Sequence, residues 1–194
     1  MSELNQSSTS QTTKKLQRIS TKDIVLTGMF AALICVLAQI VIPTQPVPFT
    51  LTIFAIFLTG ALLSPRYAFI AGVIYLALGI IGVPVFSNFQ GGLQELTGKL
   101  GGYRIAYPFM AFIIAIFYQK IKKYKVLALA IGMVIALATC YLFGTVWFSV
   151  ITNMPFKSAV VACVLPFILV DSIKIVLAII ISIAIRKTAF RYLA

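Results

Sequence analysis

An acidic and a basic side chain lie three residues apart inside the most apolar part of the sequence. Asp171 and Lys174 belong to the run PFILVDSIKIVLAIIIS, and this spacing places both on one face of a helix. A charge at the middle of a bilayer costs about 2.5–3.5 kcal/mol, so such residues usually face a cavity or a partner. An accepting carboxylate beside a donating ammonium would suit a neutral ligand with adjacent N–H and C=O groups. Alternatively, the two charges only neutralise each other and hold helices together.

The string GGLQELTGKLGG invites comparison with a phosphate-binding loop. Five residues separate Gly92 from Gly98, whereas the Walker motif needs four, and Leu100 replaces the Ser or Thr that would hold magnesium. The sequence therefore predicts no ATP binding by this chain, and energy for any transport must come from a partner or an ion gradient.

The residue types that catalysis and metal binding need are scarce. There is no histidine, and the four acids are Glu3, Asp23, Glu95 and Asp171. No Ser-His-Asp, Cys-His or paired-carboxylate arrangement can be built from these residues, so we expect no enzyme activity. Three cysteines lie far apart in apolar runs, without zinc-type spacing, and are interpreted as small buried residues: Cys35, Cys140 and Cys163.

The composition points to a membrane as the solvent of the chain. Of 194 residues, 61% are hydrophobic and 10% charged, against about 45–50% and 25% in soluble domains. This composition excludes an ordinary water-facing surface. The net charge of +12 could suggest nucleic acid, but the basic residues stand between apolar runs rather than among exposed polar groups on one face. Nucleic-acid binding is therefore not expected.

Six apolar runs predict an all-α membrane protein whose six transmembrane helices form a single bundle. The runs are residues 24–42, 49–63, 67–82, 103–118, 126–151 and 158–185. A span needs about 20 residues, so the second and fourth runs are expected to extend into their flanks. The last run is longer than a span needs and contains Pro166, where the helix is expected to kink or begin.

The basic residues predict which ends of these spans face the cytoplasm. Placing the N-terminus inside puts twelve basic residues in the cytoplasm and three outside, with Lys174 within a span. The outer three are Lys99, Arg104 and Lys157. We therefore expect residues 1–22 to be a disordered cytoplasmic tail, 23–188 the transmembrane domain, and 189–194 a cytoplasmic C-terminal tail.

Two of the predicted outer segments are unlike ordinary hydrophilic loops. Residues 43–48 read PTQPVP, and residues 83–102 contain two Gly-Gly pairs and two phenylalanines with few charges. Apolar, non-helical backbone near a membrane is tolerated where it is buried in protein or lines a cavity. The second segment is interpreted as a lid or wall of a substrate site, with a flexible glycine loop as the alternative.

Small residues follow one side of the first run. Gly28 and Ala32 form a small-xxx-small pair, with Ala31 and Cys35 on the adjoining row. Such residues let two helices approach closely in lipid. The approaching helix could belong to a partner or to the chain's own bundle, and the spacing does not decide between them.

Four motifs, taken together, resemble the BioY family, the substrate-binding membrane subunit (S component) of energy-coupling-factor (ECF) biotin importers. They are PVPFT at 46–50, GVPVFSNFQGG at 82–92, GGY at 101–103 and PFILVDSIK at 166–174. The resemblance extends from about residue 24 to 185. The chain departs from the family pattern at Thr52, where glutamine is usual, at Lys99 and Leu100 within a Gly-Pro-Thr-Gly-Gly-Tyr string, and at Val170, where glycine is common.

The resemblance implies a six-helix S component that binds one biotin near the outer face of a prokaryotic plasma membrane. Biotin would be the transported ligand rather than a cofactor. Asp171 and Lys174 match the family's D-x-x-K and would contact the bicyclic ureido head. The glycine-rich 3–4 loop, with Gly91 and Gly92, would cover the ligand.

The resemblance also implies the remaining contacts. Asn88 and Tyr103 are candidate walls of the pocket, and Arg104 or Lys99 could neutralise the valerate carboxylate. The face containing Gly28, Ala31, Ala32 and Cys35 would dock on a transmembrane coupling subunit driven by two ATPases.

Three other functions remain open at this stage. An S component for a different vitamin would keep the architecture and change the pocket. A stand-alone proton-coupled carrier would use Asp171 as its proton relay. A membrane scaffold without transport activity would bind no tight ligand.

Overall fold

The computed structural model describes residues 20–44, 47–121 and 123–189. The predicted tails, residues 1–22 and 189–194, lie almost entirely outside these ranges and remain predictions. The elements are α1 (Thr21–Leu37), β1 (Val41–Ile42), β2 (Phe49–Thr50), α2 (Thr52–Leu62), α3 (Pro65–Ile81), η1 (Ser87–Phe89), α4 (Gln94–Thr97), α5 (Gly101–Lys120), α6 (Lys125–Thr152), α7 (Phe156–Cys163) and α8 (Leu165–Ala189).

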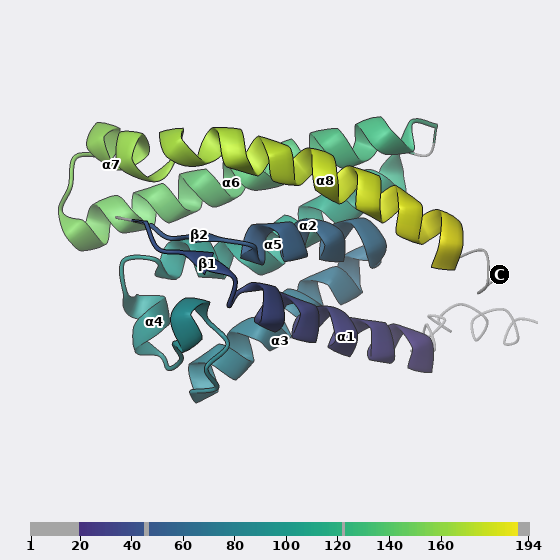
Figure 1. The fold of residues 1–194 in the computed structure, drawn as a ribbon, viewed down its shortest axis with the longest axis horizontal. Helices are drawn as coiled ribbons and strands as arrows, with labels where there is room; N and C mark the ends of the chain where they lie inside the picture. The colour runs from purple at the N-terminus through teal and green to yellow at the C-terminus, as the bar shows by residue number, and fades with distance from the viewer. Residues whose placement is uncertain (1–19, 45–46, 122, 190–194) are drawn as a thin grey trace, which may run out of the picture.

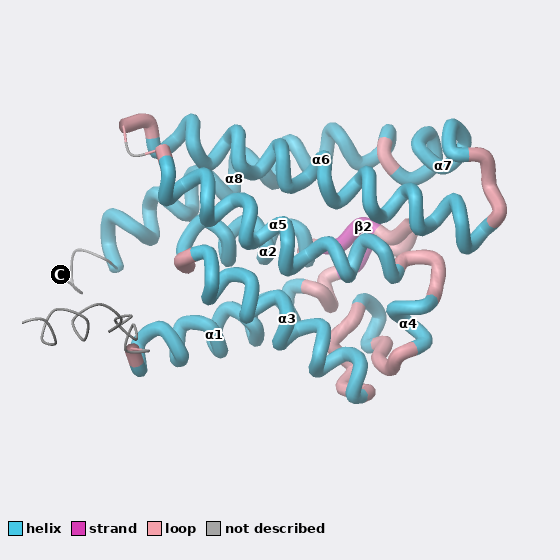
Figure 2. Tube along the Cα trace, turned by 180° about the vertical axis from the view of Figure 1, so that it is seen from behind, coloured by secondary structure: helices cyan, strands magenta, loops and turns pink. Residues whose placement is uncertain are grey.

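The long helices form one bundle with two different ends. Helix α1 begins and α8 ends at the same end of the bundle (Figure 1). The β1–β2 pair, α4 and α7 lie at the opposite end, and the view from behind shows the same arrangement (Figure 2). The segments from which the sequence predicts a ligand site are therefore gathered at the end opposite the start of α1 and the end of α8.

Helix α2 is the central element of the core. It contacts α1, α3, α5 and α8, and every residue from 55 to 62 is buried. Close packing depends on small residues: a Cβ on Gly60 would lie 2.7 Å from the carbonyl oxygen of Ala111 on α5. The sequence alone does not show that this short apolar segment is surrounded by protein, because continuous apolarity also suits a lipid-facing helix.

Among the residues that the structure describes, three helices are long and apolar enough to cross a membrane: Gly101–Lys120, Lys125–Thr152 and Leu165–Thr188. Two shorter apolar helices are Thr52–Leu62 and Pro65–Ile81. The fourth run extends into its flanks as expected. The second run, residues 49–63, was expected to extend in the same way. This expectation is wrong, because Phe49 and Thr50 form strand β2 and the helix begins only at Thr52. At 1.5 Å per residue, the 11 residues of α2 measure only about 16 Å.

A short β-pairing precedes α2. Strands β1 and β2 are antiparallel, with Val41 opposite Thr50 and Ile42 opposite Phe49. The turn between them is the predicted outer segment 43–48, in which residues 45 and 46 lie outside the described ranges. The sequence predicted helices and no strands, so this strand pair differs from the expected all-α fold. The pair brings the Thr50 backbone against the bundle.

The last apolar run is divided into two helices. Helix α7 ends at Cys163 and α8 begins at Leu165, so Pro166 is the second residue of α8. Proline suits a first helical turn because the N–H that it lacks would have no partner within the helix. The prediction that a helix kinks or begins at Pro166 is confirmed.

Candidate functional site

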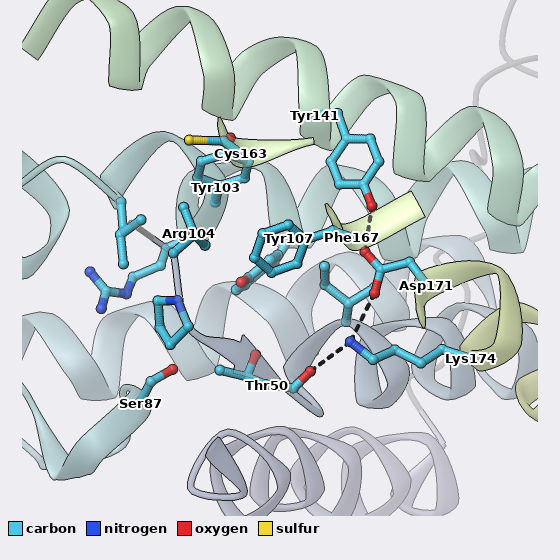
Figure 3. Close-up of a pocket in the computed structure, with 14 residues that line it drawn as sticks. Thr50, Ser87, Tyr103, Arg104, Tyr107, Tyr141, Cys163, Phe167, Asp171 and Lys174 are labelled. Atoms are coloured by element: carbon cyan, nitrogen blue, oxygen red, sulfur yellow. Dashed lines mark hydrogen bonds and ion pairs between the residues drawn. The ribbon is translucent and has the colours of Figure 1, made fainter. Parts of the chain in front are cut away.

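Residues of β2, α2, η1, α5, α6, α7 and α8 line a cavity in the structure (Figure 3). It encloses ≈ 560 Å³ when its open mouth is included. The lining residues are Val47, Pro48, Thr50, Ile53, Ser87, Leu100, Tyr103, Arg104, Tyr107, Tyr141, Cys163, Phe167, Asp171 and Lys174.

The predicted charged pair lies in the wall of this cavity. Asp171 is fully buried, and the exposed fraction of Lys174 is 7%. Lys174 Nζ donates to Asp171 Oδ1 at 2.8 Å and to the Thr50 carbonyl of β2 at 2.8 Å. The hydroxyl of Tyr141 on α6 donates to Asp171 Oδ2 at 2.6 Å, so both carboxylate oxygens are engaged (Figure 3).

The pair retains hydrogen-bonding positions for a ligand. An ionised carboxylate offers about four lone-pair positions, and an ammonium has three donors. The bonds described above use two positions on Asp171 and two donors on Lys174. Asp171 has no exposed surface, so a ligand can use these positions only after neighbouring side chains move. A pair that only neutralised charge inside the bundle would not need to line a cavity.

Aromatic side chains form much of the remaining wall. Tyr103 bonds to Thr145 through its hydroxyl at 3.0 Å, and its ring packs against α6 where a Cβ on Gly144 would lie 2.2 Å away. Phe167 lines the cavity and packs on Phe49 with ring centroids 4.2 Å apart. These rings offer apolar surface beside the charged pair, as expected for a pocket that takes a partly apolar molecule.

Arg104 reaches the same cavity from α5 but already has a partner. It is 5% exposed, forms an ion pair with Glu95 at 2.9 Å and also donates to the Glu95 carbonyl. Its guanidinium carbon lies 4.8 Å from the centre of the Phe86 ring. Arg104 therefore joins α4 to the start of α5 at the cavity wall. The resemblance implied a different role for it, as the cation beside the valerate carboxylate of the ligand.

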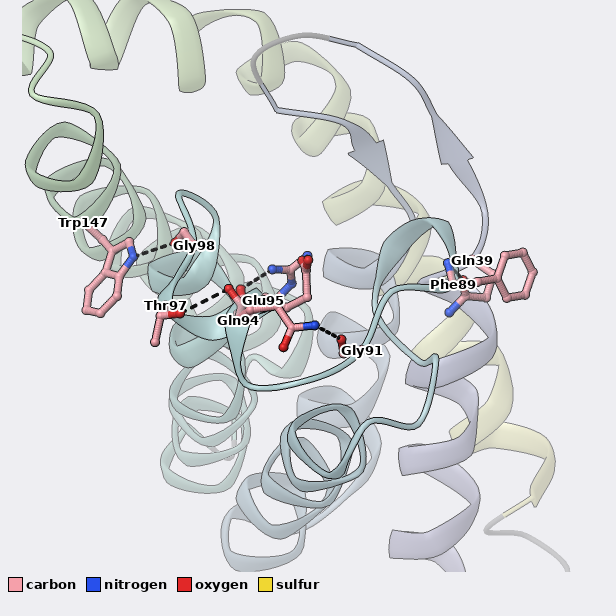
Figure 4. Close-up of polar contacts among 9 residues, drawn as sticks. Gln39, Phe89, Gly91, Gln94, Glu95, Thr97, Gly98 and Trp147 are labelled. Atoms are coloured by element: carbon pink, nitrogen blue, oxygen red, sulfur yellow. Dashed lines mark hydrogen bonds and ion pairs between the residues drawn. The ribbon is translucent and has the colours of Figure 1, made fainter.

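The 83–100 segment is fastened to three helices (Figure 4). Besides the bond to Arg104, Gln39, two residues after the end of α1, accepts the Phe89 N–H at 2.9 Å. Trp147 on α6 donates to the Gly98 carbonyl at 2.9 Å. These contacts place the segment over the end of the bundle opposite the start of α1 and the end of α8, beside the cavity that Ser87 and Leu100 line.

Four predicted site residues do not line this cavity: Asn88, Gly91, Gly92 and Lys99. Asn88 is exposed and adopts a positive φ of 62°. Gly92 has a φ of 101° and donates its N–H to the Gly79 carbonyl at 2.7 Å. A Cβ on Gly91 would lie 2.6 Å from the Val83 carbonyl oxygen. The two glycines thus let the segment pack on the end of α3, and their contact with a ligand remains a prediction.

The proposed docking face of α1 is divided. Gly28 and Ala32 are exposed, and a Cβ on Gly28 would meet nothing within 4 Å. Ala31 is 2% exposed and belongs to the core, whereas Cys35 is half-buried. Among the residues that the structure describes, Ala31 therefore packs within the bundle, whereas Gly28 and Ala32 do not.

Sequence reasoning missed Tyr141, Thr50 and Glu95 as parts of the site. A tyrosine inside an apolar run carries a weak signal, because its buried hydroxyl needs a partner. Thr50 contributes a backbone carbonyl, which no side-chain pattern can reveal. Glu95 was visible as one of few acids, but its ion pair with Arg104 depends on how the segment folds.

Comparison with known proteins gives consistent results. The BioY family profile matches residues 9–191. A probable biotin transporter BioY of Pyrococcus horikoshii is 36% identical over 161 residues, covering 83% of this chain and 94% of its own. The biotin transporter BioY of Thermotoga maritima is 37% identical over 166 residues, covering 86% and 96%.

The fold agrees with these similarities. The crystal structure of the S-component for biotin from an ECF-type ABC transporter superposes with a TM-score of 0.79 and 32% identity. The match covers 86% of this chain and 92% of that one. The apolar helices and the similarity to transporters indicate a multi-pass membrane protein. From the family profile and the relatives, the chain belongs to the BioY family.

Proposed function

We propose that this chain binds biotin and serves as the substrate-specific S component of an ECF-type importer. The observation that carries the proposal is the buried Asp171–Lys174 pair, which lines a cavity and keeps free hydrogen-bonding positions. Membership of the BioY family and the relatives named as biotin transporters support it.

The chemistry of the cavity suits the two ends of biotin. The ureido ring presents N–H donors to the Asp171 carboxylate and a carbonyl acceptor to the Lys174 ammonium. Tyr103, Tyr107 and Phe167 offer surface to the apolar part of the molecule. Arg104 lines the same cavity and supplies the cation for the valerate carboxylate, while still bonded to Glu95.

The proposal includes a membrane arrangement. Helices α1, α2, α3, α5, α6 and α8 make six passes, with the termini in the cytoplasm and the cavity near the outer face of a prokaryotic plasma membrane. Because the Gly28 and Ala32 surface is exposed and small, a helix of a transmembrane coupling subunit can approach it closely. Two partner ATPases supply the energy, and this chain performs no catalysis.

Equilibrium binding with a vitamin panel tests the proposal. The full chain, purified in detergent, is titrated with biotin, riboflavin, thiamine and pantothenate, and small molecules that co-purify are identified by mass spectrometry. Tight binding of biotin alone is expected. Tight binding of another vitamin would assign the chain to a different substrate, and binding of none would overturn the transport function.

A further inference from the structure

A second cavity, here called the vestibule, adjoins the cavity that contains the charged pair. It encloses ≈ 1220 Å³ including its open mouth. The lining residues are Pro43, Thr44, Pro48, Ser87, Asn88, Gln90, Gln94, Glu95, Gly98, Lys99, Leu100 and Arg104. Pro48, Ser87, Leu100 and Arg104 line both cavities. A molecule that extends past these residues from the first cavity therefore enters the vestibule.

The first cavity has two chemically different ends. Asp171 and Lys174 lie at one end, and Arg104 and Ser87 lie at the other, with Tyr107 drawn between them (Figure 3). The guanidinium group of Arg104 points away from the charged pair (Figure 3). With the ureido ring of biotin at the pair, as in the proposed function on which this inference rests, the valerate chain extends toward Arg104. Its carboxyl group then lies at the boundary with the vestibule.

Arg104 does not depend on a ligand carboxylate as its counter-ion. It is 5% exposed, yet its guanidinium forms an ion pair with Glu95 at 2.9 Å and donates to the Glu95 carbonyl. A buried arginine whose only counter-ion came from the ligand would be stranded by an uncharged ligand, at a cost of about thirtyfold or more in affinity. Here an amide in place of the carboxylate leaves the pair with Glu95 intact, and its carbonyl still accepts from Arg104.

The vestibule can receive a charged extension of the ligand. Besides Arg104, its lining includes one acid, Glu95, and a further cation, Lys99. The Glu95 side chain remains 22% exposed, and Lys99 is exposed. An amino acid attached through its side chain brings one ammonium and one carboxylate, which are attracted to Glu95 and Lys99 respectively.

From this geometry we propose that the chain also binds amides of biotin that are extended at the valerate carboxyl by an amino acid. The bicyclic head lies in the first cavity, the amide passes Arg104, and the zwitterionic end of the amino acid lies in the vestibule. The ureido end offers no comparable space, because Asp171 has no exposed surface. The site therefore selects its substrates at the ring and accepts variation at the end of the chain.

Equilibrium titration of the full chain in detergent tests this substrate class with biotin, its simple carboxamide, biotinyl-lysine joined through the lysine side chain, and biotin methylated on a ureido nitrogen. We expect the carboxamide to bind within about thirtyfold of biotin, because Arg104 is not stranded. Biotinyl-lysine should bind more tightly than the carboxamide. The methylated ring should bind at least about tenfold more weakly than biotin, because it loses a donor to a charged acceptor.

The outcomes separate this inference from the proposed function. Tight biotin binding with a greater than thirtyfold loss for the carboxamide, or with biotinyl-lysine no tighter than the carboxamide, would overturn the inference alone. A methylated ring that binds as well as biotin would overturn the placement of the head and the inference with it. Absence of biotin binding would overturn the proposed function as well.

Glu95→Gln tests the charge argument. It removes the counter-ion of Arg104, so the ratio of the carboxamide's dissociation constant to that of biotin should rise at least about tenfold. Both ligands are measured on the same variant, so a change in its folding affects them alike. Lys157→Gln, at an exposed cation that lines neither cavity, should leave the ratio unchanged. An unchanged ratio in Glu95→Gln would refute the argument.

Gln90→Trp tests the vestibule itself, and it decides the outcome with the ligand panel if Glu95→Gln does not fold. Gln90 is exposed and lines the vestibule but not the first cavity. Biotinyl-lysine should lose its advantage over the carboxamide, whereas biotin affinity stays the same. Leu93→Trp, at an exposed position of the same segment outside both cavities, is the matched control and should preserve the advantage. An advantage that survives Gln90→Trp would place the lysine elsewhere and refute the inference.

Discussion

The hydroxyl of Tyr141 on α6 lies 2.6 Å from Asp171 Oδ2 on α8, and Lys174 holds the other carboxylate oxygen at 2.8 Å. The carboxylate is therefore fixed between two helices at the wall of the cavity. A group held in this way is already oriented for a ligand, so little conformational freedom is lost on binding. The following predictions depend on this arrangement and on the contacts around it.

Asp171→Asn should weaken biotin binding by at least about tenfold, since each hydrogen bond to a charged group contributes about 1.5–3 kcal/mol. The substitution also strands the Lys174 ammonium at membrane depth. Isothermal titration with biotin and with an analogue lacking the ureido N–H donors measures the effect. The wild-type chain should discriminate against the analogue more than the variant does. Unchanged affinity of both Asp171→Asn and Lys174→Met in folded preparations would make the pair purely structural.

Tyr141→Phe should weaken biotin binding by about three- to tenfold, because it removes one bond that orients Asp171 while keeping the ring. Tyr103→Phe is the matched comparison: its hydroxyl bonds to Thr145 and not to the carboxylate. A fluorescence or calorimetric titration of both variants measures the difference. A larger effect of Tyr103→Phe would contradict the prediction that Tyr141 supports biotin binding by orienting Asp171.

Glu95→Gln should speed the dissociation of biotin and lower the melting temperature, because Arg104 loses the ionic partner that joins α4 to α5. The loss is expected at about 1–3 kcal/mol for a partly buried charged bond. Lys157→Gln, at an exposed cation of α7 that does not line the cavity, is the control. Stopped-flow displacement of a labelled biotin gives the rates, and equal rates in the two variants would contradict a fastening role.

Gly28→Trp should leave biotin binding nearly intact and reduce co-purification with the coupling subunit, because a Cβ there meets nothing within 4 Å in this chain. Ala32→Trp should act in the same way. Ala31→Trp places the same bulk in the core, so it should destabilise the protein itself. Pull-down from membranes, with melting curves for each variant, separates the outcomes. Equal loss of binding and docking in Gly28→Trp would point to packing within the bundle.

The proposed orientation places Lys123 inside the cell and Asn88 outside. In a variant without the native cysteines, Lys123→Cys should resist an impermeant thiol reagent in intact cells, and Asn88→Cys should react. Both positions are exposed, so burial in the protein does not protect either one. Labelling of Lys123→Cys before lysis would reverse the topology that the basic residues predict.

Features that depend on local spacing or on composition can be read from the amino-acid sequence alone. Asp171 and Lys174 are three residues apart, so one helix face carries both whatever the rest of the fold does. Pro166 marks a helix start because proline lacks an N–H. The near absence of charged residues in the long runs indicates membrane helices, since lipid rather than water must solvate them.

Tertiary structure decided which faces meet. A helix that is apolar all round carries no pattern to show its buried side, so the sequence could not separate Ala31 in the core from Ala32 on the surface. Tyr141 and Thr50 lie 30 and 124 residues from their partners in the charged pair, and only the packing of α6, α8 and β2 brings them together. Glu95 meets Arg104 for the same reason: a hydrogen bond between distant residues requires a fixed geometry, which residue spacing does not encode.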